Sequence, residues 1–231
     1  MFQKFFSSLI AVVFSLLVVP VLLAAQHQQV VIAYGVRKQS LPVTIVYPNH
    51  YDKQRRYPVI FTLPPGAGNA AMVDVNLALW EEQAKQRGYL IVAPQIYGLS
   101  LQSDADQTVP AIFNWMEKYL NYDTARVTIT GQSNGGIGVF YAVLAEPRRF
   151  NKILVLPGFY QGNIRDLGAL KGKSVLMFVG GNDPQWRRQS SETLKALQYI
   201  GAKTKLIVLP GQRHILSIDP GVLMDWVKRK P

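Results

Sequence analysis

The chain has 231 residues, of which 48% are hydrophobic, and this length and composition suit one domain with a buried core rather than a disordered segment. The net charge is +11, but the basic residues are scattered and form no run with interleaved aromatic residues, so the sequence carries no nucleic-acid-binding motif. The absence of cysteine excludes structural disulfides, a cysteine nucleophile and a cysteine-linked lipid anchor.

Residues 1–25 have the layout of a secretory signal peptide, in which Lys4 is followed by a long apolar run that ends in Ala24 and Ala25. A cleaved leader would place the protein outside the cell or in the periplasm, and export without cysteine favours a bacterial envelope. The apolar run is also long enough to span a membrane, so a retained anchor is the alternative. The positive charge predicts only weak association with anionic envelope surfaces. We expect residues 26–231 to form a single folded domain.

After the leader, short runs rich in β-branched residues alternate with segments in which apolar residues have helical spacing. Two leading runs predict a hairpin. This alternation indicates an α/β fold, with a mostly parallel sheet of about eight strands and helices on both faces. Ligands of such sheets bind beyond the carboxyl ends of the strands. The predicted strands are 29–36, 42–48, 57–63, 89–94, 125–130, 152–158, 174–181 and 204–210, and the predicted helices are 75–87, 108–120, 189–200, 220–229 and one that begins near 134.

The stretch "GQSNG" lies between a predicted strand and a predicted helix, so that Gly131 and Gly135 stand two residues to either side of Ser133. This G-x-S-x-G pattern between a strand and a helix is typical of a nucleophile elbow. We expect a side chain at either glycine to collide with its neighbours, because the turn is sharp. The same turn lifts the serine hydroxyl clear of the sheet. Gly136 and Gly138 are expected to let the helix pack closely on the sheet.

A serine hydroxyl is a poor nucleophile until a base removes its proton. Of the three histidines, His27 lies beside the leader and His50 lies in a turn before the third strand. His214 follows the last predicted strand, at the carboxyl edge of the sheet, and is the candidate base.

An acidic residue is expected to orient the base. Asp183 follows the strand that precedes His214 and is the candidate, while Asp166 follows an earlier strand and is the alternative. Asp219 is too close to His214 in the sequence. The order of Ser133, Asp183 and His214 along the chain is the order found in α/β-hydrolases.

Hydrolysis of an acyl group needs backbone N–H donors for the oxyanion. One is expected from Asn134, which follows the serine, and the other from Ala67 in the loop "LPPGAGN". Gly66 and Gly68 let this loop turn toward the site, although an ordinary glycine turn is the alternative.

These motifs resemble the α/β-hydrolase superfamily, and especially its secreted single-domain esterases related to polyhydroxybutyrate depolymerases, feruloyl esterases and esterase D. The matching motifs are "YPVIFTLPPGAGN", "GQSNGG", "GGNDPQW" and "LPGQRH", which span most of residues 41–230. Pro65 stands where these enzymes usually have histidine, and it cannot donate because proline has no N–H. The resemblance implies that residues 26–231 are a catalytic domain that hydrolyses carboxylic esters through an acyl-enzyme, without metal or cofactor.

Only residues 157–173 lie between the apolar strand residues 152–156 and the next predicted strand, at the point where many lipases insert a helical cap, so we expect no large lid. Tyr97, Phe159, Tyr160 and Trp186 follow strand ends and are expected to line an open aromatic cleft for small or polymeric esters, or alternatively to be partly buried packing. The same triad would serve an acyltransferase or a peptidase, and a non-catalytic binding scaffold is a third reading. The sequence leaves the ester, the acyl chain length and the oligomeric state open.

Overall fold

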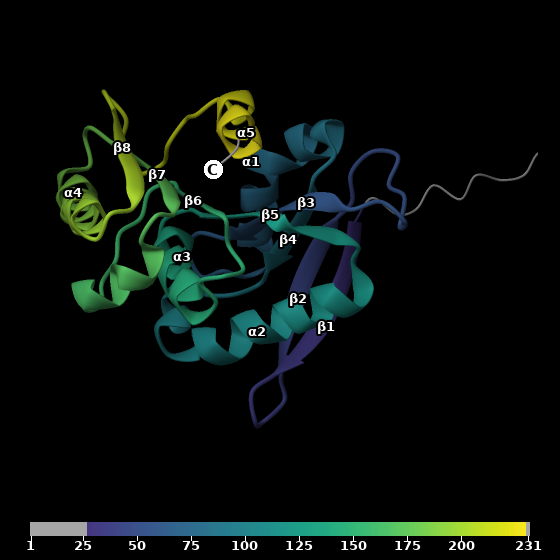
Figure 1. The fold of residues 1–231 in the computed structure, drawn as a ribbon. Coiled ribbons are helices and arrows are strands. Elements are labelled where there is room, and N and C mark those ends of the chain that lie inside the picture. Colours follow the sequence, from purple (N-terminus) through teal and green to yellow (C-terminus); the bar gives the residue numbers. More distant parts are fainter. Residues whose placement is uncertain (1–26, 230–231) are drawn as a thin grey trace, which may run out of the picture.

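The computed structural model describes residues 27–229, and an eight-stranded sheet lies at its centre (Figure 1). The predicted signal peptide lies outside the described residues. Within the described part of the chain, none of the helices has the length and apolar character needed to cross a membrane. The strands are β1 (His27–Tyr34), β2 (Gln39–Val46), β3 (Tyr57–Leu63), β4 (Leu90–Pro94), β5 (Tyr122–Gly131), β6 (Lys152–Val155), β7 (Ser174–Gly180) and β8 (Lys203–Leu209).

The strand order in the sheet is β1-β2-β4-β3-β5-β6-β7-β8. β1 and β2 form the predicted hairpin, and β2 also runs antiparallel to β4. The remaining pairs, from β4 through β3 to β8, are all parallel. The prediction of a mostly parallel sheet of about eight strands is therefore confirmed, and the carboxyl ends of its parallel strands lie along one edge.

Helices cover both faces of the sheet (Figure 1). One face carries a core built with α1 and α5, and the other carries a larger core built with α2, α3 and α4. A short 3-10 helix precedes α2, and a second one lies between β6 and β7. The helices are α1 (Ala70–Arg87), η1 (Gly98–Ser100), α2 (Leu101–Tyr119), α3 (Asn134–Ala145), η2 (Ile164–Leu170), α4 (Pro184–Tyr199) and α5 (Pro220–Lys228).

Helices α1 and α2 both begin earlier than their apolar spacing predicted. The sequence placed the start of α1 at residue 75, but it begins at Ala70, because the side chain of Asn69 accepts a hydrogen bond from the Met72 N–H at 3.1 Å. The sequence placed the start of α2 at residue 108, but it begins at Leu101 and continues through Pro110. Proline inside a helix removes one backbone hydrogen bond, and here the buried apolar face of α2 continues on both sides of it.

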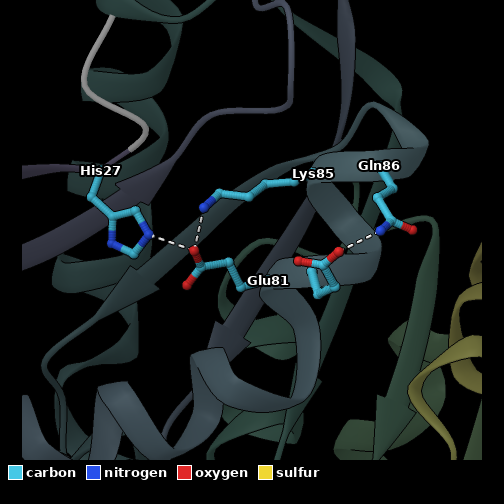
Figure 2. Close-up of polar contacts among 5 residues, drawn as sticks. His27, Glu81, Lys85 and Gln86 are labelled. Carbon is cyan, nitrogen blue, oxygen red and sulfur yellow. Dashed lines mark hydrogen bonds and ion pairs between the residues drawn. The ribbon is translucent and has the colours of Figure 1, made fainter. Parts of the chain in front are cut away.

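A small group of charged side chains ties the start of β1 to α1 (Figure 2). His27 Nε2 lies 2.8 Å from Glu81 Oε1, and the Lys85 ammonium contacts the same oxygen. Burial opposes the charge on Glu81, but the hydrogen bonds from Lys85 and His27 outweigh it and lower the pKa of this carboxyl. His27 therefore has a partner on α1, remote from the carboxyl edge of the parallel strands.

Candidate active site

Ser133 lies in a sharp turn between β5 and α3. Its backbone has φ 53° and ψ −119°, a conformation that favours glycine and that other residues adopt only when their surroundings enforce it. One contact that holds this conformation is with the segment that follows β6, the strand next to β5. β6 ends at Val155 rather than at residue 158, and the carbonyl of Pro157 accepts a hydrogen bond from the Ser133 N–H at 3.0 Å.

The two glycines beside Ser133 are required by close backbone contacts. A Cβ atom at Gly131 would lie 2.4 Å from the carbonyl oxygen of Gly135. A Cβ atom at Gly135 would lie 2.4 Å from the carbonyl oxygen of Leu63, at the end of β3. Real Cβ atoms do not approach backbone oxygens this closely, so the turn can close only with glycine at both positions.

The other two glycines of α3 allow close approach to loops rather than to the sheet, which corrects the expectation from the sequence. A Cβ atom at Gly136 would lie 2.0 Å from the Pro157 carbonyl oxygen, and one at Gly138 would lie 2.8 Å from that of Gly98. The first turns of α3 are thus pressed against the segment after β6 and against η1, both at the carboxyl edge. Loop contacts of this kind depend on the tertiary fold and have no signal in the local sequence.

The structure brings together the three candidate residues Ser133, His214 and Asp183 in one chain of hydrogen bonds. Ser133 Oγ lies 2.8 Å from His214 Nε2, and His214 Nδ1 lies 2.9 Å from Asp183 Oδ2. A carboxylate can only accept, so Nδ1 carries the ring proton and Nε2 is left to accept the seryl proton. The His214 side chain is 39% exposed and that of Asp183 is 12% exposed, so the imidazole faces solvent while the carboxylate lies beneath it.

Asp183 is held in place by the start of a helix. α4 begins at Pro184 rather than at residue 189, and Asp183 is its N-cap. While Oδ2 contacts His214, Oδ1 accepts a hydrogen bond from the Trp186 N–H at 3.4 Å. The proline at the first helical position is also favourable for a helix start. Both carboxylate oxygens therefore have partners, which restricts the rotation of the group that faces the imidazole.

The two other aspartates considered from the sequence have different partners. Asp166 accepts a hydrogen bond from the Tyr160 hydroxyl at 3.0 Å, and Asp219 caps α5 by accepting from the Gly221 N–H at 2.7 Å. Burial, and then the hydrogen bond to Asp166, raise the pKa of the Tyr160 hydroxyl, so it stays protonated as the donor. Neither aspartate hydrogen-bonds to His214 in the described part of the chain.

The loop at residues 64–68, which we call the oxyanion loop, follows β3 beside the elbow. Gly66 and Gly68 have φ values of 56° and 67°, in the left-handed region where glycine is favoured. A Cβ atom at Gly68 would lie 1.9 Å from the Ile96 carbonyl oxygen, so the loop is packed closely on the segment after β4. The Gly68 N–H donates to the Pro65 carbonyl at 3.1 Å, so this N–H is engaged within the loop.

The two predicted oxyanion donors remain predictions. Asn134 is the first residue of α3, and the first N–H groups of a helix have no acceptor one turn earlier. Ala67 lies at the exposed tip of the oxyanion loop. The catalytic contribution of each N–H is testable only through the reaction.

We expect Ala67→Pro, which removes the N–H of this residue, to lower kcat by roughly 10²–10³-fold, as loss of one oxyanion donor does in other hydrolases. Ala67→Gly retains the N–H and should keep most of the activity. Thermal unfolding of both variants would show whether proline has distorted the loop. Full activity in a folded Ala67→Pro protein would move the second donor to Gly66.

The aromatic residues near the triad divide into exposed and buried members. The Trp186 ring contacts the His214 ring edge-on, with centroids 4.4 Å apart, and Phe159 packs against Trp186 at 4.8 Å. Phe159 is only 5% exposed, so it mainly supports Trp186, which is the packing alternative left open by the sequence. Tyr97 is 42% exposed and directly precedes η1.

Phe159 and Tyr160 also form one wall of a surface pocket of about 470 Å³ between η2 and α4. Its other wall is one face of α4, which includes Gln189 and Glu192. Gln189 Oε1 is buried without a hydrogen-bond partner among residues 27–229. Because η2 is the only helix between β6 and β7, the expectation of no large lid is confirmed.

Sequence reasoning missed a hydrogen-bonded chain of three polar side chains close to the elbow. Gln132 Nε2 donates to Asn76 Oδ1 at 3.0 Å, and Asn76 Nδ2 donates to Thr62 Oγ1 at 2.7 Å. Asn76 and Thr62 are fully buried. One feature of the sequence could have revealed this chain of hydrogen bonds: Asn76 is polar but shares the buried face of α1 with Val73 and Trp80.

A scan against models of known protein families finds no match, and a search of curated proteins finds none. Solved structures do share the fold. A thermostable esterase is similar with a TM-score of 0.68 and 18% identity, over 88% of this chain and 60% of that one. An acetyl xylan esterase from Aspergillus awamori has a TM-score of 0.69 and 13% identity, over 88% of this chain and 99% of that one.

A putative dipeptidyl aminopeptidase IV from Bacteroides ovatus is also similar, with a TM-score of 0.69 and 13% identity over 89% of this chain. The chain spans 36% of this peptidase and 60% of the thermostable esterase, so it is shorter than both. Identities this low establish the fold alone. The chain has the α/β-hydrolase fold, as the motifs predicted, and esterases and peptidases both use it.

Proposed function

We propose that the protein is a serine hydrolase that cleaves carboxylic esters. The observation that carries this proposal is the continuous hydrogen-bonded chain from Ser133 through His214 to Asp183, built at a strained turn on the carboxyl edge of an α/β-hydrolase sheet. Strain at a non-glycine residue costs on the order of 1–3 kcal/mol and is typical of functional turns.

In the proposed reaction, Ser133 Oγ attacks the ester carbonyl carbon while His214 Nε2 takes the seryl proton. The N–H groups of Asn134 and Ala67 stabilise the resulting oxyanion. The imidazolium, stabilised by Asp183, then gives its proton to the departing alcohol as the carbon–oxygen bond breaks. Water attacks the acyl-enzyme by the same route, which releases the acid and restores the serine.

The half-exposed imidazole, with no large lid over it among residues 27–229, supports small esters or ester groups on a polymer as substrates. In this proposal Trp186 and Tyr97 contact the substrate near the reacting carbon, and Tyr160 contacts a larger group in the neighbouring pocket, where Phe159 serves mainly to support Trp186. We also propose export through the leader at residues 1–25, which sequencing of the N-terminus after expression in a bacterial host would test.

Acyl transfer and peptide hydrolysis would use the same three residues, so the distinguishing test is substrate choice. We expect the purified protein to hydrolyse p-nitrophenyl acetate, and a series of longer acyl chains would map the pocket. Peptide p-nitroanilides should be turned over far more slowly. Comparable rates on anilides would identify a peptidase, and no turnover of any ester would contradict the proposal.

A further inference from the structure

The side chain of Asn134 forms a bridge between the elbow and the oxyanion loop. Its Nδ2 donates to the Gly66 carbonyl at 3.1 Å. The chain reaches Gly66 from β3 and Asn134 from β5, so this bond joins two segments that are far apart in the sequence. It is separate from the role proposed for Asn134 above, which uses only the backbone N–H.

The carbonyl that Asn134 holds belongs to the peptide group that carries the Ala67 N–H. A trans peptide group is planar, and its C=O and N–H point in opposite directions. A hydrogen bond to the Gly66 oxygen therefore also fixes the direction of the Ala67 N–H. Ala67 is exposed, so burial of its own side chain does not hold the peptide, and Gly66 has no Cβ atom that would restrict rotation of this backbone.

A second link fastens both ends of the oxyanion loop to the residue before Ser133. Thr62 lies on β3, which leads into the loop, and Asn76 lies within α1, the helix that follows the loop. The bond between them, and the bond from Gln132 to Asn76, join these ends to the elbow. Polar networks that are buried and satisfied hold their members in one arrangement, because a broken bond leaves a buried group unpaired. Because the elements at both ends of the loop are held, the main motion left to the loop is rotation of the peptide group between Gly66 and Ala67.

We propose that Asn134 is a positioning residue for the reaction. Its side-chain amide sets the orientation of the peptide group between Gly66 and Ala67 and so directs the Ala67 N–H at the oxyanion. The inference rests on the proposed function, because it concerns the stabilisation of an oxyanion. Asn134 thus contributes twice, by its own N–H and by holding the second donor.

The test is Asn134→Asp, which keeps the backbone N–H and nearly the same size but places a carboxylate oxygen against the Gly66 carbonyl. We expect kcat on p-nitrophenyl acetate to fall by roughly 10–100-fold, less than the loss of a whole oxyanion donor, while KM changes little. The affinity for a trifluoromethyl ketone, which forms an oxyanion on Ser133, should fall by the same factor as kcat. Asn134→Ala, which removes the donor without adding a negative charge beside the oxyanion, should show the same parallel loss, whereas a merely structural role would lower the melting temperature without it. Asn134→Gln, which keeps an amide donor, should recover part of the activity.

Asn121→Asp is the matched control. Asn121 Nδ2 donates to the Lys53 carbonyl at 3.2 Å, an exposed bond beside the start of β5, at the opposite edge of the sheet from the triad. This variant should retain the kcat of the wild type. If Asn134→Asp also retains it, or loses kcat without losing affinity for the ketone, the positioning role is overturned and the esterase proposal stands. A wild-type protein that hydrolyses no ester would overturn both.

Discussion

Ser133→Ala is expected to abolish ester hydrolysis while the protein remains folded. In a well-studied serine hydrolase, loss of the nucleophile lowers kcat by roughly 10⁶-fold. The side chain is partly exposed and its hydroxyl bonds to the half-exposed His214, so little packing is lost. Hydrolysis of p-nitrophenyl acetate and circular dichroism of the purified variant would measure the two effects.

Two further measurements make this assignment decisive. A fluorophosphonate should label the wild-type protein at Ser133, as identified by mass spectrometry of its peptides. Ser133→Gly should be as inactive as Ser133→Ala but more stable by about 1 kcal/mol, because glycine relieves the strained φ of 53°. Label on a different serine, or near-normal activity in either variant, would show that the elbow does not carry the nucleophile.

Asp183→Asn is expected to lower kcat by roughly 10⁴-fold, the loss seen for the equivalent change in another serine hydrolase. An amide can donate to Nδ1 of His214, which would favour the ring form with its proton on Nε2, where it cannot accept from the serine. The helix start should survive, because asparagine is as good an N-cap as aspartate and can still accept from the Trp186 N–H. Steady-state kinetics and thermal unfolding would therefore separate loss of activity from loss of stability.

Asp166→Asn is the matched comparison for this prediction. The amide oxygen of the variant can still accept the hydrogen bond from the Tyr160 hydroxyl, so both stability and kcat should stay close to those of the wild type. A large loss of kcat in Asp166→Asn, with activity retained in Asp183→Asn, would place the acid after β6 instead of after β7.

Local patterns in the sequence determined the order of the strands along the chain and the place of the elbow. The spacing of apolar residues, with a period of two in strands and 3.6 in helices, indicates which residues each element buries. The close contact between Gly131 and Gly135 lies within the turn itself. The elements and the elbow can therefore be predicted from residues that are neighbours in the sequence. The sequence also placed Ser133 and His214 at the same edge of the sheet, because the carboxyl ends of parallel strands share one edge.

Only the tertiary structure shows which of Asp183 and Asp166 lies beside His214, because this depends on which carboxylate the packed loops bring within 2.9 Å of the ring. Asn76 likewise contacts Gln132, and the Asn134 side chain contacts the oxyanion loop, although these segments lie far apart in the sequence. No local sequence pattern predicts either contact. Such bonds depend on the assembled sheet, since their partners come from different strands and helices and lie at geometries that no local pattern encodes.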